Sequence, residues 1–421
     1  MLRKLSVLLF ALIAQLPALA ADHPDAPTDP RLQQAFEHLL GAINDSASGL
    51  WRDPYYTGAR DQAAGAAYWA QMLIRTLEED IVQDPDFPLF RVVDFRVREG
   101  ADNPDQRYLV APIRGGERYR IWGRKGGERR LEFQVYSGLP WSEKGGKVVA
   151  SLNTEQLRTD ANGNFEILLD PHHQSGNWLA NSASADMVMV RQIFSDWPRE
   201  QGGEVHIDRV DYEGSLKPAP SAADMAARLE RAAVNFRALV PLWPRFAREH
   251  YAQSEVNTLS PLFDPGSAGG VTGRWMSLGE FQLEEDEALL LTTWPSTGNY
   301  QGIQLTDRWT SSLEYANRQT SLNADQAWRS ADGAWRFVIS HRDPGVQNWL
   351  DTTGLRHGFM LLRFDGTNGV PIPAEQSPRL QKVRFQQLHE YLPADTPTFD
   401  AEQRRHAIEQ RRRHVQQRFG V

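Results

Sequence analysis

The sequence predicts a mainly β protein with helical additions (α+β), built from two antiparallel β-sandwich domains, an N-terminal helical pair and a helical connector. Three observations predict this class. Apolar and polar residues alternate with period two in residues 105–215 and again in 287–390, as in half-buried strands. The second block repeats motifs of the first in the same order, which indicates a duplication. Helical spacing of apolar residues occurs before and between the blocks.

Length and composition indicate a globular protein with several domains. A chain of 421 residues is too long for one ordinary core, and its 41% apolar and 24% charged residues are those of a soluble fold. A net charge of -8 argues against nucleic acid as a partner, since phosphate binding needs a clustered basic surface. The predicted segments are 1–20 (signal peptide), 21–104 (helical N-terminal region and linker), 105–215 (first β-sandwich domain), 216–286 (helical connector and Gly-rich loop), 287–390 (second β-sandwich domain) and 391–421 (basic C-terminal helix).

The N-terminus has the pattern of a secretory signal. A positive start at Arg3-Lys4 precedes an apolar run from Leu5 to Ala14, and small residues precede a cleavage site near Ala20. We therefore expect an exported protein, periplasmic or secreted. The apolar run is short for a bilayer span and no later run is long enough, so no membrane span is expected. The sequence does not indicate an oligomeric state.

Three long helices are predicted before the second sandwich. Asp29 precedes Pro30 as an N-cap precedes the first helical position, and Ser221 forms a capping box with Asp224. The apolar stripe expected on the first helix is Leu32, Ala35, Phe36, Leu39, Leu40 and Ile43. The stripe expected on the second is Ala70, Leu73, Ile74, Leu77 and Ile81, and on the third Met225, Leu229, Ala232, Phe236 and Leu239.

Corresponding motifs in the two β blocks carry the prediction of a duplication. Asn177-Trp178-Leu179 recurs as Asn348-Trp349-Leu350, and Asp170-Pro171 recurs as Asp343-Pro344. The other predicted correspondences are Asn162-Gly163 with Asp332-Gly333, Pro112 before Tyr119 with Pro295 before Tyr300, and Arg191 with Arg363. One large sandwich whose turns are similar by chance is the alternative interpretation.

The C-terminal tail is predicted to be a basic helix that starts near Ala401. Its basic residues are Arg404, Arg405, Arg411, Arg412, Arg413 and Arg418. A solvated terminal helix is the favoured interpretation, because charged runs usually face water. Docking to an anionic surface or partner is the alternative.

The candidate catalytic residues lie in the polar segment 341–358. His341 can exchange protons near neutral pH, and Asp343 and Asp351 are candidates for a carboxylate pair that performs acid–base chemistry. His341, Arg342 and Asp351 have no counterpart in the first motif copy, which favours a functional role. Turn chemistry at Asp343 is the structural alternative.

The same segment supplies candidate ligand-binding residues. Arg342 can hold an anion, and Trp349 can stack on a flat or sugar-like ligand. Asn348 either contacts a ligand or ties loop backbone, and Trp349 otherwise fills the sandwich core. The shared Asn-Trp-Leu motif favours the structural roles.

A second polar stretch, upstream, completes the candidate binding site. Polar residues this dense between strands usually mark a loop over a cleft. Its candidate ligand-binding residues are Asp307, Tyr315, Arg318 and Asn323. A crossover loop held by its own hydrogen bonds is the alternative.

Metal and cofactor sites are not expected. The absence of cysteine excludes disulfides, thiolate nucleophiles and cysteine-based zinc sites. His172 and His173 are adjacent, so on a strand they point to opposite faces. The Gly-rich loop at 266–273 lacks the spacing of a P-loop or a dinucleotide fold.

Two separated motifs resemble the bacterial domain of unknown function 1214, which is often found with a related domain numbered 1254. They run from Asp307-Arg308-Trp309 to Asn323, and from His341-Arg342-Asp343-Pro344 to Thr352. The resemblance covers about Glu287 to Phe364, and more loosely extends back to Tyr108. The resemblance implies a β-sandwich-type domain with helical additions. Exported members of the family are familiar, and the resemblance implies no established reaction. Members often have His after the last Gly, whereas Leu355 follows Gly354 here and His357 is near.

Three functions follow as hypotheses. The favoured one is a binding or accessory protein that holds a small organic or glycan ligand beside the segment 341–358. The rival is a hydrolase or lyase that uses Asp343 and Asp351 with His341. An envelope structural protein without a small ligand is the third, since a fold alone does not determine function.

Overall fold

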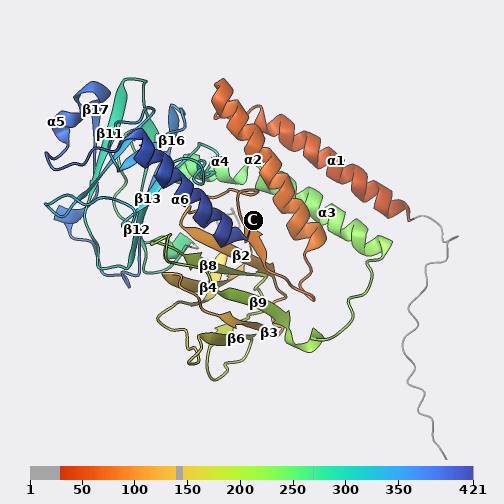
Figure 1. The fold of residues 1–421 in the computed structure, drawn as a ribbon. Helices are drawn as coiled ribbons and strands as arrows, with labels where there is room; N and C mark the ends of the chain where they lie inside the picture. Colours follow the sequence, from red (N-terminus) through yellow and green to blue (C-terminus); the bar gives the residue numbers. More distant parts are fainter. Residues whose placement is uncertain (1–28, 139–145, 269, 421) are drawn as a thin grey trace, which may run out of the picture.

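The computed structural model describes residues 29–138, 146–268 and 270–420. The predicted signal peptide at 1–20 lies outside these residues. Within them, no helix combines the length and the apolar character needed to cross a membrane. Two β-sandwiches, a group of three long helices and a C-terminal helix make up the fold (Figure 1).

The first sandwich packs a five-stranded sheet on a four-stranded one. The orders are β1-β2-β8-β4-β5 and β7-β6-β3-β9, and every pair is antiparallel except β6 with β7. Inward-facing residues such as Phe133, Ile167 and Val190 fill the space between the sheets. The strands are β1 (Arg91–Val93), β2 (Gln106–Pro112), β3 (Tyr119–Arg124), β4 (Arg130–Ser137), β5 (Lys147–Leu152), β6 (Asn164–Asp170), β7 (Trp178–Ala180), β8 (Met187–Ile193) and β9 (Glu204–Arg209).

The second sandwich packs two four-stranded sheets. The orders are β10-β16-β12-β13 and β15-β14-β11-β17, and only β14 and β15 are parallel. Phe281, Ile339 and Leu362 belong to its core. The strands are β10 (Trp275–Gln282), β11 (Glu287–Thr293), β12 (Tyr300–Thr306), β13 (Ser321–Asn323), β14 (Trp335–Ser340), β15 (Trp349–Asp351), β16 (His357–Asp365) and β17 (Arg379–Arg384). This sandwich begins at β10, earlier than the predicted boundary at 287.

The two sandwiches repeat one topology. Apart from the extra strand β1 beside β2, each strand from β2 to β9 has the same neighbours in its sheet as the corresponding strand from β10 to β17. The register agrees as well, because Gln134 faces Met189 and Gln304 faces Leu361 across equivalent strand pairs. Arg191 donates to Gln134 and Arg363 donates to Gln304, so the predicted correspondence of the two arginines holds in space.

The Asn-Trp-Leu motifs form the short parallel strands β7 and β15. The Asn177 side chain accepts from the Arg158 N–H and donates to the Arg158 carbonyl. Asn348 makes the same two bonds with Trp328. Each Trp Nε1 donates to the carbonyl at the end of the preceding long strand, Asp170 for Trp178 and Ser340 for Trp349. These bonds explain why both copies keep the motif.

Two predicted correspondences are wrong in register. Asp170 ends β6 and its counterpart is Ser340 at the end of β14, whereas Asp343 lies beyond β14 in the following loop. Tyr119 begins β3, whose counterpart is β11, whereas Tyr300 begins β12. The similar turn and tyrosine residues therefore arise at different places in the repeat.

Three long helices pack together (Figure 1), and α2 and the C-terminal end of α3 share a core with the outer face of strands β10 and β16. They are α1 (Pro30–Leu50), α2 (Ala59–Leu77), which continues as a π-helix (Glu78–Val82), and α3 (Ala222–Leu239), followed by α4 (Leu242–Phe246) and a second π-helix (Ala247–Tyr251). Asp29 caps α1, and Ser221 with Asp224 forms the predicted capping box of α3.

The apolar stripe of α3 is largely as predicted, but those of α1 and α2 differ. Phe36 and Leu40 of α1 are exposed, because its small residues Ala35 and Ala42 contact α3 instead. The buried residues of α2 are Gly65, Tyr68, Met72, Arg75 and Thr76, whereas the predicted Ala70, Ile74 and Leu77 are exposed. A Cβ at Gly65 would lie 2.6 Å from the Trp309 ring, so this glycine lets α2 approach the second sandwich closely.

The C-terminal helix α6 (Ala401–Phe419) lies across both sandwiches (Figure 1), after the short α5 (Leu388–Tyr391). Arg404, Arg411 and Arg418 are buried along one side of it. Arg411 donates to the carbonyls of Tyr315 and Ser321 in the second sandwich. The prediction of a solvated helix is therefore wrong for this side, because a seven-residue spacing returns a side chain to the same face.

Candidate functional site

The proposed catalytic residues have separate contacts. Asp343 accepts from Arg404 Nε at 2.9 Å and thereby fastens α6. Asp351 accepts from Arg318 Nη1 at 2.7 Å and from the Thr353 N–H at 2.7 Å. No contact joins the two carboxylates among the described residues, which favours bracing roles over a shared acid–base pair.

His341 is tied to its own sandwich. Its Nε2 lies 3.1 Å from the carbonyl oxygen of Leu283, which can only accept, so Nε2 carries the proton. Its Nδ1 then accepts from Thr352 Oγ1 at 2.6 Å. Both ring nitrogens are thus satisfied within the protein.

Four of the proposed ligand-binding residues are structural in their contacts. Asn348 and Trp349 make the backbone bonds described above, and Arg342 stacks with its guanidinium 4.4 Å from the Phe385 ring centroid. Asn323 is fully buried and donates to Asp105 Oδ1 at 3.0 Å. These residues hold loops and sandwiches together.

Tyr315 and Arg318 also have protein partners. Tyr315 is buried between the guanidinium groups of Arg98 and Arg418, and burial raises its pKa to about 12. Arg318 is half-exposed and pairs with Asp351. Neither residue lines the cavity described next.

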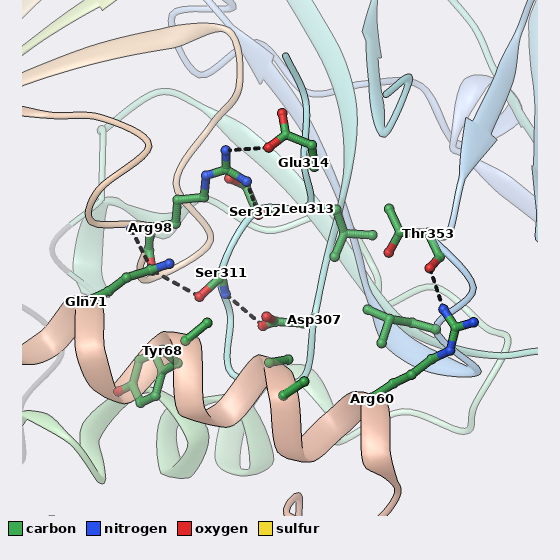
Figure 2. A pocket seen from close by; sticks show the side chains of 14 residues that line it. Arg60, Tyr68, Gln71, Arg98, Asp307, Ser311, Ser312, Leu313, Glu314 and Thr353 are labelled. Atoms are coloured by element: carbon green, nitrogen blue, oxygen red, sulfur yellow. Dashed lines mark hydrogen bonds and ion pairs between the residues drawn. The ribbon is translucent and has the colours of Figure 1, made fainter. Parts of the chain in front are cut away.

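Asp307, the remaining proposed residue, borders a cavity of about 330 Å³ between α2 and the second sandwich (Figure 2). We call this space the α2 cavity. Helix α2 supplies one wall, the loops after β12 and β15 supply the other, and Arg98 of the linker closes one end. Its lining residues are Arg60, Ala63, Ala64, Ala67, Tyr68, Gln71, Arg98, Asp307, Ser311, Ser312, Leu313, Glu314, Thr353 and Leu355.

The loop after β12 is built around Asp307. Its Oδ1 accepts from the backbone N–H groups of Trp309 and Ser311, each at 2.9 Å, as in an Asx-turn. No protein donor in the described part of the chain reaches Oδ2. Asp307 is only 8% exposed, and burial raises its pKa to about 7. One oxygen of a nearly buried carboxyl is therefore left for a molecule in the cavity.

Arg98 of the linker is held by this loop and by α2. Ser311 Oγ donates to the Arg98 carbonyl, and Gln71 accepts from the Arg98 N–H. The guanidinium donates to Glu314 at 3.2 Å and lies beside the Ser312 carbonyl (Figure 2). Its charge is thus neutralised, and its position is set from two elements.

Arg60 at the other end of the cavity is held by backbone. Its Nη1 donates to the Thr353 carbonyl at 2.9 Å. Gly354 has a φ of +77°, which favours glycine, and its lack of a side chain leaves room for this guanidinium. Asp351 holds the Thr353 N–H, so the predicted carboxylate acts on the cavity through Thr353.

Thr353, which lines the cavity, and Thr310, in the loop that carries Asp307 and Ser311, have left-handed backbone conformations. Thr310 has φ 66° and Thr353 has φ 55°. Such residues disfavour this region at a cost of about 1–3 kcal/mol each, and the strain concentrates at functional sites. Gly100 N–H donates to Thr310 Oγ1 and Ala101 N–H donates to its carbonyl, so the linker maintains the strained turn.

The arrangement suits a small polar molecule and acid–base chemistry. A cavity of this volume is at the small end for organic ligands, and Arg60, Gln71, Asp307 and Thr353 present both donors and acceptors. A carboxyl that titrates near neutral pH can give or take a proton. Within the described residues, no group of three or more His, Asp or Glu side chains is placed to hold a metal ion.

Sequence reasoning missed most of the cavity. Arg60, Gln71 and Arg98 come from helix and linker segments without a motif, more than two hundred residues before Asp307. The run Gln62-Ala63-Ala64-Gly65-Ala66-Ala67 was the available signal, because small residues on one helix leave room beside a neighbour. No local pattern, however, says which neighbour that is.

Comparison with known proteins adds support for the fold. No family model and no curated protein matches the sequence. The chain is similar to an uncharacterised protein from Burkholderia cenocepacia, with a TM-score of 0.76 and 27% identity over 85% of this chain and 99% of that one. A Vibrio parahaemolyticus protein matches at a TM-score of 0.43 and 11% identity over 76% of this chain and 98% of that one. The Burkholderia protein shares the architecture along most of the chain, and its description names no activity.

Proposed function

We propose that the protein binds a small polar organic molecule, of the size of a monosaccharide or a hydroxy acid, in the α2 cavity. The observation that carries the proposal is Asp307, a nearly buried carboxyl whose Oδ2 lacks a protein donor at a cavity of about 330 Å³. Burial of the carboxyl disfavours its charged form, and a ligand or water in the cavity can supply Oδ2 with the partner that the protein does not.

The construction of the cavity supports a ligand. Strained backbone at Thr310 and Thr353 is maintained by contacts from the linker and from Asp351. Strain of this kind persists when the surroundings impose it, and functional sites are where it is found. A surface that only joins helix to sandwich would not need it.

An acid–base enzyme is the second candidate. Asp307, with a pKa of about 7, favours it over the carboxylate pair suggested by the sequence, because Asp343 and Asp351 are each engaged by an arginine. Conversion of a bound compound that stops in Asp307→Asn would assign the enzyme. Binding without conversion would assign a binding protein.

Two further proposals concern context. The signal-like segment at 1–20 supports export, so the ligand would be met in the periplasm or outside the cell. The motifs at Asp307 and His341 support kinship with the domain of unknown function 1214.

Thermal melting with a panel of sugars, sugar acids and hydroxy acids tests the binding proposal, since selective binding to the native state raises the melting temperature. Ala67→Leu extends a side chain from α2 into the cavity without changing charge, and leucine is a good helix former. Ala70→Leu is the matched control, because Ala70 is exposed on α2 outside the cavity.

We expect a compound-specific rise in wild type and Ala70→Leu that is lost in Ala67→Leu. A rise that survives in Ala67→Leu would move the site elsewhere. No rise with any compound would leave the envelope structural role as the better hypothesis.

A further inference from the structure

Arg60 is an exposed side chain at the end of the cavity, oriented by one hydrogen bond and without an ion-pair partner among the described residues. Its Nη1 donates to the Thr353 carbonyl, and the absence of a side chain at Gly354 gives the guanidinium its space. Among the described residues no carboxylate forms an ion pair with it, whereas Arg98 at the other end of the cavity pairs with Glu314. A guanidinium left unpaired at a cavity is suited to a carboxylate or another planar oxyanion.

Asp307, across the cavity from Arg60, does not repel an anionic ligand when its carboxyl is protonated and therefore neutral. Figure 2 shows Asp307 between Arg60 and Arg98, with Oδ2 free of protein donors. A protonated Asp307 donates a hydrogen bond from Oδ2, and an ionised one accepts from a hydroxyl. Because both groups border the same small cavity, one molecule can contact both.

We propose, building on the function above, that the ligand is a small hydroxylated carboxylic acid whose carboxylate pairs with Arg60 and whose adjoining oxygen contacts Asp307. Binding such an anion draws a proton onto Asp307. The proton comes from the buffer and remains on Oδ2 while the ligand is bound, so no covalent bond changes in the ligand.

The charged groups that face Asp307 determine whether a bound anion raises its pKa. Asp102 of the linker and the ligand carboxylate both disfavour a negative Asp307, whereas Arg98 favours it. Tyr68 and Arg60 face it from α2, and Glu314 of its own loop is neutralised by Arg98. Since burial already holds the pKa near 7, a bound anion raises it further, and proton uptake is largest just above neutral pH.

Calorimetric titration with matched acids and amides tests the charge requirement. The pairs are glucuronate with glucuronamide, and lactate with lactamide, which differ in charge and hardly in shape. We expect wild type to bind the acid of at least one pair roughly ten-fold more tightly than its amide, as one charge-assisted bond allows. Arg60→Gln should lose the preference, whereas Arg52→Gln, which removes an exposed charge outside the cavity, should keep it.

The proton is measured in the same titrations. At pH 7.5, buffers of different ionisation enthalpy should report net proton uptake by wild type and none by Asp307→Asn. Amides that bind as tightly as acids, or an acid preference unchanged in Arg60→Gln, would overturn this inference and leave the proposed function standing. If neither partner of any pair binds, or if all binding persists in Ala67→Leu, the cavity is not the site and both proposals fail.

Discussion

Asp307 shows at the residue scale how a turn residue becomes a candidate functional group. Its Oδ1 is used by the loop backbone, as in many Asx-turns, and its Oδ2 faces the α2 cavity. Burial opposes ionisation, because the charged form loses hydration, and the attraction to Arg98 offsets only part of that loss. The carboxyl therefore stays partly protonated near neutral pH, and its ionisation at higher pH lowers the free energy of unfolding.

The pH dependence of folding should reveal this residue. An acid whose pKa rises from 3.8 to about 7 on folding stabilises the native state at low pH, and that stability is lost as pH rises from about 4 to 7. In wild type we expect the free energy of unfolding, measured by urea unfolding, to fall by about 1 kcal/mol per pH unit over pH 5–7. In Asp307→Asn this fall with pH should disappear. Asp332→Asn is the control, because the pKa of Asp332 is lowered to about 2 and its contribution changes only below pH 4.

Substitutions of Asp343 and Asp351 should differ in their effect on ligand affinity. Asp343→Ala removes the partner of Arg404 and should lower the free energy of unfolding by about 1–2 kcal/mol without changing ligand affinity. Asp351→Ala frees the Thr353 N–H and should weaken binding at Arg60 as well. Melting curves with and without the ligand found in the panel measure both effects, and equal loss of affinity in the two variants would contradict the assignment.

The residues that were predictable are those whose role is local. Asn348 and Trp349 act on backbone within their own repeat, so a motif recurring in the sequence was enough to suggest a structural role. Arg60 could not be predicted, because its position depends on Thr353 and Gly354, which are distant in sequence. Local chemistry is visible in a motif, but a partner across the fold is not.

Helices show at the element scale why composition alone misleads. Helix α6 is strongly basic, yet the side carrying Arg404, Arg411 and Arg418 is buried and donates to backbone carbonyls of the second sandwich and the linker. The long aliphatic stems and the aromatic rings around Arg418 make such burial possible. The apolar stripe of α1 misled for the converse reason, since small alanines formed its buried face.

Arg411→Met tests the role of α6. The variant keeps most of the volume but leaves the carbonyls of Tyr315 and Ser321 and the Ser321 hydroxyl without their donor. We expect a loss of about 2–4 kcal/mol in the free energy of unfolding. Arg405→Met, on the exposed side of the same helix, should change it by less than about 0.5 kcal/mol; similar losses in both variants would count against a buried clamp.

The whole molecule joins its two sandwiches through buried polar groups. Asp105 of the linker accepts from Trp197 of the first sandwich and from Asn323 and Tyr300 of the second. Arg274 and Asp365 form a buried ion pair in the second sandwich, close to this junction. Duplication of the strands was readable from repeated motifs, whereas this junction was not, because its residues differ between the copies.

Unfolding should be cooperative across the junction. We expect one thermal transition for wild type and, for Asp105→Ala, a loss of about 3 kcal/mol with separation into two transitions, because three buried donors lose their acceptor. Differential scanning calorimetry distinguishes the cases. Asp325→Ala removes a partly exposed carboxylate that pairs with Arg129 and should leave a single transition.

The position of the ligand is the most direct test of the central claim. A crystal structure with the compound that most raises the melting temperature should show it between α2 and the loop after β12, within hydrogen-bonding distance of Asp307 Oδ2 and Arg60. The same compound bound instead in the larger cavity of about 930 Å³ between the end of α2 and α3, or on the surface near Asp343, would contradict the account.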